Sequence, residues 1–88
     1  MEDVIAQDVT IRIAAYQANY LRALPLHHSQ TETENTQTHT TFRFHLKPTF
    51  DLRLELLSLG DDVEVLQPEW FRLEMKHVVE NVAEKYMV

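Results

Sequence analysis

A single glycine separates two apolar patterns of different period in the C-terminal half of this chain. Gly60 is the only glycine among 88 residues, and it follows a leucine-rich run that suits the end of a helix. Glycine adopts the left-handed backbone conformation at little steric cost, so it commonly stands just past a helix. Beyond it, Val63 and Val65 alternate with a polar residue, as in a short strand, and Pro68 suits the first turn of another helix. The stretch therefore predicts helix, turn, strand and helix in that order.

The N-terminal half shows the same two periods. Val9, Ile11 and Ile13 alternate with polar residues, which indicates a half-buried strand. A short helix ends before Pro25, and two polar, threonine-rich segments then suggest a hairpin that turns near residues 35–37. The predicted elements are strands over 8–14, 29–34, 38–47 and from residue 63, and helices over 16–24, 50–59 and 69–86. The first six have the βαββαβ connectivity of a ferredoxin-like sandwich, an α+β fold, and the last is an additional C-terminal helix.

The segment from Phe50 to Leu56 has two interpretations. Its strict alternation of apolar and charged residues favours a strand, whereas its leucine, glutamate and arginine residues are good helix formers and none is β-branched. We predict a helix, with Phe50, Leu54 and Leu57 on one apolar face joined by Leu56. The turn after it contains Asp61 and Asp62, which are common turn residues.

The side chains of the third predicted strand indicate which face of the sheet is buried. Phe42, Phe44 and Leu46 share one face, and Arg43 and His45 share the other. Exposed phenylalanines would make a stacking platform for nucleic-acid bases. Burying the charged face instead would leave charges without partners in the core, so we expect the phenylalanines inside. The predicted core is Ile11, Ile13, Leu21, Phe42, Phe44, Leu46, Leu54, Leu57, Val63 and Val65.

The composition indicates one domain, over residues 1–88, without membrane or disulfide chemistry. The chain is 44% hydrophobic and 25% charged, within the range of ordinary globular domains. It has no cysteine, which fits a reducing cytoplasm, and no apolar run long enough to span a bilayer. Residues 1–3 are acidic where a signal peptide would be basic. The formal charge of −6 opposes unassisted binding to a phosphate backbone.

The residues that could carry catalysis or bind a metal do not form a known site. His27 and His28 are adjacent, so on a strand they would face opposite sides. His39 and His45 would lie about 20 Å apart along one strand, too far to share a zinc ion. Ser29 has no activating acid and no glycine elbow beside it. We therefore expect no enzymatic activity, no metal and no cofactor.

Several short motifs, in the right order, resemble the WCX-like C-terminal extension of bacterial WYL-domain transcriptional regulators. The usual text of that family runs roughly L-L-S-[LF]-G-x-x-[VA]-x-V-L-x-P-x-x-L-R, and a P-L-H-x-S-Q motif often precedes its hairpin. The matching segments here are Leu56–Gly60, Val63–Leu66, Pro68–Glu69, Phe71–Arg72, Pro25–Gln30 and Phe42–Leu46. Phe71 replaces the usual leucine. The resemblance extends over about residues 9–86.

The resemblance implies a longer chain than this one. Such regulators typically have an N-terminal winged helix-turn-helix, then a WYL barrel thought to sense a ligand, then the extension. By this resemblance the partners would be the absent helix-turn-helix and WYL domains, and DNA would be bound only through the absent N-terminal domain. A homodimer is a further expectation.

Three functions from different classes are compatible with the sequence. The first is a regulatory module that mediates self-association, domain docking or the response to an effector. The second is direct binding of a nucleotide or single strand on the open sheet face, through Arg12, Arg43 and His45. The third is a purely structural domain. The last helix bears on the first function, because its apolar stripe of Phe71, Met75, Val78, Val82 and Tyr86 is long for so small a core. The stripe could fold back onto the sheet, or Val78, Val82 and Tyr86 could contact a partner.

Overall fold

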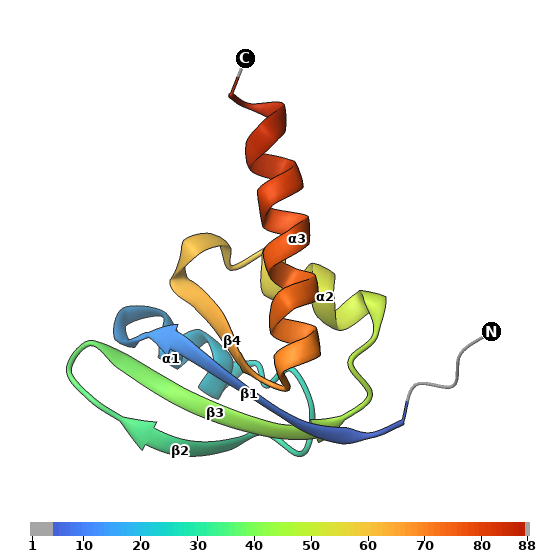
Figure 1. Cartoon of the computed structure of the whole chain (residues 1–88). Coiled ribbons are helices and arrows are strands. Elements are labelled where there is room, and N and C mark those ends of the chain that lie inside the picture. The colour runs from blue at the N-terminus through green and yellow to red at the C-terminus, as the bar shows by residue number, and fades with distance from the viewer. Residues whose placement is uncertain (1–4, 88) are drawn as a thin grey trace.

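A computed structural model describes residues 5–87, so the acidic start at residues 1–3 lies outside it (Figure 1). The helices and strands follow one another in the order that the sequence predicts. A short 3₁₀ turn is added after the second helix. In chain order they are β1 (Gln7–Ala14), α1 (Ala15–Ala23), β2 (Thr31–Asn35), β3 (His39–Leu46), α2 (Phe50–Leu57), the 3₁₀ turn η1 (Gly60–Asp62), β4 (Val63–Gln67) and α3 (Glu69–Lys85).

The four strands form one sheet in the order β2-β3-β1-β4, and every neighbouring pair is antiparallel. The register aligns the apolar residues of three strands. Ile11 of β1 lies opposite Phe42 of β3 and opposite Val65 of β4. Because side chains alternate across a sheet, this register directs all three side chains to the same face. The predicted mixed α and β class, with a four-stranded antiparallel sheet, is confirmed.

The core lies on that face, between the sheet and the helices. Phe42 and Phe44 are almost completely buried, which confirms the predicted orientation of β3 and excludes a stacking platform on these two rings. Ala18 and Leu21 of α1 join the same cluster of buried side chains. The buried apolar set is Val9, Ile11, Ile13, Ala18, Leu21, Phe42, Phe44, Leu46, Leu52, Leu56, Val65, Phe71 and Met75.

The predicted apolar face of α2 is wrong. Phe50 and Leu54 are 58% and 52% exposed, whereas Leu52 and Leu56 are buried and Leu57 packs at the edge of the core. Leucine recurs on several sides of this helix, so its local periodicity does not select one face. Tertiary packing selects it: Leu52 and Leu56 join the buried cluster, and Arg53 of α2 pairs with Glu74 of α3.

Gly60 has the left-handed conformation that the sequence predicts, with a φ of 64°. It stands at the start of η1, because α2 ends at Leu57, two residues before the predicted end. Asp62 of this turn accepts hydrogen bonds from the Tyr16 hydroxyl and from Nε2 of Gln17. The acidic turn therefore ties the end of α2 to the start of α1.

Candidate functional site

Arg12, Arg43 and His45 lie on the open face of the sheet, as predicted. Arg12 lies opposite Thr41, and Arg43 lies opposite Thr10, in the pairing of β1 with β3. His45 lies opposite Asp8 in the same ladder. The three residues therefore share a face, but their charges are compensated to different degrees.

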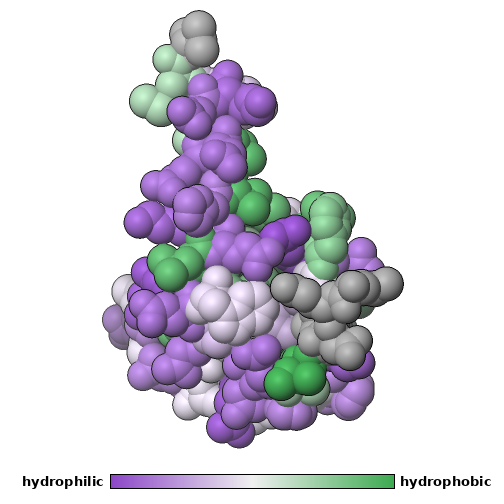
Figure 2. Space-filling model, turned by 45° about the vertical axis from the view of Figure 1, so that its right-hand side comes forward, coloured by the Kyte–Doolittle hydropathy of each residue, from purple (hydrophilic) through white to green (hydrophobic). Residues whose placement is uncertain are grey.

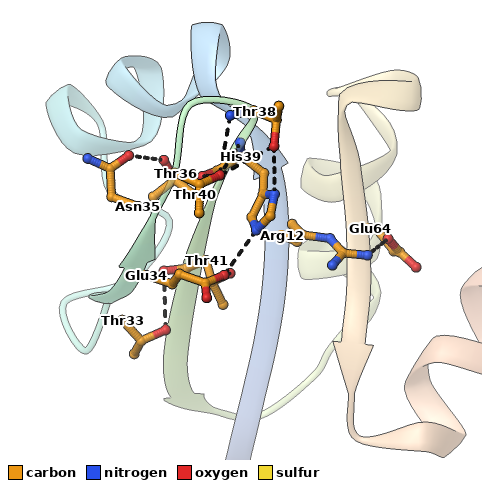
Figure 3. Close-up of polar contacts among 10 residues, drawn as sticks. All are labelled: Arg12, Thr33, Glu34, Asn35, Thr36, Thr38, His39, Thr40, Thr41 and Glu64. Carbon is orange, nitrogen blue, oxygen red and sulfur yellow. Dashed lines mark hydrogen bonds and ion pairs between the residues drawn. The ribbon is translucent and has the colours of Figure 1, made fainter.

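Arg12 is part of a three-residue ion-pair network that joins the sheet to α3. Its Nη2 lies 2.7 Å from Oε1 of Glu64 on β4 (Figure 3), and Nη1 of Arg72 lies 2.6 Å from Oε2 of the same carboxylate. The Arg12 and Arg72 guanidinium groups hold the pKa of Glu64 below its ordinary value. Arg72 also donates to the Val65 carbonyl at 2.8 Å. The positive charge of Arg12 is thus largely compensated within the domain.

The histidines of β3 are also paired with carboxylates. Nδ1 of His45 lies 3.0 Å from Oδ1 of Asp8, and Nε2 of His39 lies 2.9 Å from Oε1 of Glu34 (Figure 3). Arg43, by contrast, is exposed and forms no ion pair within residues 5–87. Of the three residues predicted to contact a ligand, only Arg43 presents an uncompensated positive charge.

The loop from Leu24 to Gln30 has a structural role that the sequence reasoning missed. Nε2 of Gln30 donates to the Leu21 carbonyl at 2.7 Å, and its Oε1 accepts from the backbone N–H of Leu26 at 3.1 Å. The Ser29 hydroxyl donates to the His45 carbonyl and accepts from the His45 N–H. These bonds fasten the loop to α1 and to the end of β3. They also use both the donor and the acceptor capacity of the Ser29 hydroxyl for the backbone of His45.

The two adjacent histidines of this loop lie on the same side, contrary to the prediction. Their ring centroids are 4.1 Å apart, and the rings are tilted by 32°. The prediction assumed the alternation of a strand, but residues 24–30 form turns and bends, where that alternation does not apply. Within the described residues, no group of three or more potential ligands could hold a metal ion.

The last helix buries only its first half. Phe71 and Met75 belong to the core, and Val78 is half-buried. Farther along, Val82 is 50% exposed and Tyr86 is 84% exposed. Figures 1 and 2 show the C-terminal half of α3 projecting from the body of the domain, with apolar groups along one side. The distal stripe does not fold back onto the sheet.

An apolar groove continues from this stripe into the body of the domain. It has a volume of about 220 Å³ and runs between α2, β4 and α3. Leu57, Val63, Leu73 and Val79 are among its lining residues, and Val79 also belongs to the exposed part of α3. The groove and the stripe therefore form one apolar surface. The periodicity of the sequence predicted only the part of it that lies along the helix.

Together, these features describe a small α+β domain whose open face has most of its charges paired, and whose last helix projects with an apolar side. The WCX domain family model matches residues 6–83, and the chain therefore belongs to that family. This membership indicates a regulatory module associated with WYL regulators. A search of curated proteins finds no match. None of the helices within residues 5–87 is long and apolar enough to cross a membrane.

Proposed function

We propose that this domain is a non-catalytic module of a bacterial, cytoplasmic WYL-family transcriptional regulator. Its task is to mediate self-association or docking of domains through the distal half of α3. The observation that carries the proposal is the exposure of Val82 and Tyr86 on the same stripe that buries Phe71 and Met75. Exposed apolar surface of this kind commonly marks a site of protein contact. DNA would be bound by another domain of the regulator.

The arrangement of α3 supports a contact rather than a solvated tail. At 100° per residue, Val78, Val79, Val82 and Tyr86 fall on one side of the helix, whereas Glu80 and Glu84 fall on the other. A helix with one apolar side and one charged side is stable when its apolar side is covered. The neighbouring groove extends the surface that a partner could cover.

We assign the domain to the ferredoxin-like class as part of the same proposal. The element order βαββαβ and the strand order β2-β3-β1-β4 support this assignment. In this arrangement one face of the sheet carries the helices and the other remains available. Binding of a single strand on that open face is the second candidate function, favoured by the unpaired charge of Arg43. One uncompensated arginine gives little affinity for a phosphate backbone, which is why we rank it second.

Sedimentation of a Val82→Glu variant tests the main proposal. In the 88-residue chain, and in the fuller regulator, the substitution should weaken self-association or docking because it puts a charge into an apolar contact. The melting temperature of the isolated domain should stay unchanged, since Val82 is half exposed. Glu84→Gln, on the opposite side of the helix, is the matched control. Unfolding of the isolated Val82→Glu domain would instead assign the distal helix to the core and reject the interface.

A further inference from the structure

The apolar groove between α2, β4 and α3 combines buried and half-exposed side chains, so it is open to solvent. Leu56, Val65 and Met75 line it and are buried, whereas Leu73 and Val79 line it and are about half exposed. An apolar cavity of about 150 Å³ accepts the six-carbon ring of benzene. On the same scale, the 220 Å³ of this groove accommodates an apolar group of about eight carbons.

The charged residues of the lining leave an excess of positive charge at the groove. Arg72 and Lys76 stand one turn apart on α3, and both line the groove. Glu64 is the only carboxylate among the lining residues that the structure describes, and it is shared between Arg72 and Arg12. Lys76 is exposed and forms no ion pair within residues 5–87. The Lys76 ammonium group is therefore available to an anion at the groove.

Arg72 has further hydrogen-bond donors at the same groove. Its bonds to the Glu64 carboxylate and to the Val65 carbonyl both use Nη1. In the part of the chain that the structure describes, Nε and Nη2 of Arg72 form no hydrogen bond. Hydrogen bonds from a guanidinium to a carboxylate are about twice as strong as those between neutral groups. Arg72 and Lys76 together offer donors for one anionic head group.

We infer that the groove binds a monocarboxylate with an aliphatic chain of about eight carbons. The chain would cover the apolar lining, and the carboxylate would contact Lys76 and the free donors of Arg72. A cationic amphiphile of the same length would instead meet two cations and a carboxylate that is already shared. This inference goes beyond the proposed contact through the distal half of α3, because Val82 does not line the groove.

Titration of the ¹⁵N-labelled 88-residue chain with octanoate tests this inference. Gly60 is the only glycine and lines the groove, so its amide signal is a resolved reporter of binding. It should shift and saturate with a Kd on the order of 1 mM, whereas the signal of Thr31 on β2 should not move. Hexanoate should bind about fourfold more weakly, since each half-covered methylene contributes about twofold in affinity. No saturable shift by about 10 mM octanoate would overturn the inference.

Octylammonium tests the charge of the ligand, because it has the same chain and the opposite charge on its head group. It should bind about tenfold more weakly than octanoate, since it loses an attraction and gains a repulsion. The net charge of the chain, −6, would by itself favour the cation, so a preference for octanoate has to come from the groove. Equal or tighter binding of octylammonium would refute an anionic ligand.

Lysine substitutions on α3 locate the head group. Lys76→Gln should weaken octanoate binding about fivefold, and Lys76→Arg should stay within about twofold of the parent because it keeps the charge. Lys85→Gln is the matched control on the same helix and should bind like the parent, since Lys85 is exposed and does not line the groove. Unchanged affinity in Lys76→Gln would refute the assigned contact.

The Val82→Glu variant separates this result from the proposed role of α3. It should bind octanoate at least as tightly as the parent, even where its self-association is lost, since Val82 does not line the groove. Loss of octanoate binding in Val82→Glu would place the ligand on the distal stripe and overturn the assignment to the groove. Octanoate binding by a parent chain that does not self-associate would support the inference and count only against the proposed role of α3.

Discussion

Phe44 illustrates how much of the stability of a small domain depends on one side chain. It lies opposite Val9 in the β1–β3 pair and is almost completely buried. Replacing a buried phenylalanine by alanine typically costs about 3–5 kcal/mol, a large part of the roughly 5–15 kcal/mol that stabilises a domain. We expect Phe44→Ala to lose most of its folded population in urea unfolding. Phe50→Ala, at an exposed position, should change stability by less than about 0.5 kcal/mol. Similar effects of the two substitutions would contradict the core described above.

The carboxylate of Glu64 should make stability depend on pH. Arg12 and Arg72 lower its pKa in the folded domain below the ordinary value of 4.5. A carboxylate with a lowered folded-state pKa stabilises the fold above the unfolded-state pKa, and this contribution disappears as the pH falls through the folded-state pKa. The parent should therefore exceed Glu64→Gln in stability at pH 7 and match it in strong acid.

Urea unfolding of both proteins over a pH series measures this difference. Because the Glu64 side chain is 40% exposed, solvent screening should keep the difference below about 1 kcal/mol. The other carboxylates titrate equally in the two proteins, so the difference isolates Glu64. A difference that stays constant with pH would show that the ion pairs do not contribute.

At the scale of elements, the packing of α2 onto the core depends on Leu56 rather than on Leu54. Leu56 is fully buried in the core cluster, whereas Leu54 is 52% exposed. Leu56→Ala should cost about 2–5 kcal/mol by leaving a cavity, and Leu54→Ala should be nearly neutral. Thermal unfolding of the two variants, which share the same chemical change on the same helix, tests the observed orientation. The reverse order of stability would restore the face predicted from sequence.

At the scale of the whole molecule, the domain should fold without the end of α3. Deleting residues 79–88 keeps Phe71 and Met75 in the core and removes mainly exposed side chains. The melting temperature should therefore change by no more than about 5 °C, while self-association should be lost. Circular dichroism and sedimentation measure the two properties on one sample. A large drop in melting temperature would mean that the distal turns stabilise the core.

The order of the elements and most of their types were determined by the sequence alone. Alternation in Val9, Ile11 and Ile13 and the positions of Gly60 and Pro68 encode local periods, which depend only on neighbouring residues. The buried face of β3 was also predictable, because the reverse would bury Arg43 and His45 without partners. The apolar stripe of α3 was also predictable, because its helical spacing is a local pattern.

Only the tertiary structure decided which of these residues meet. Arg12 and Glu64 are 52 positions apart in the sequence, and they form an ion pair because β1 and β4 pair in one particular register. The buried face of α2 is the one whose Leu52 and Leu56 join the core, and a helix with leucine on several sides does not choose a face by itself. The loop of residues 24–30 is held in place because Ser29 and Gln30 form hydrogen bonds with the backbone of His45 and Leu21. Such contacts join residues far apart in sequence, so no local period contains them.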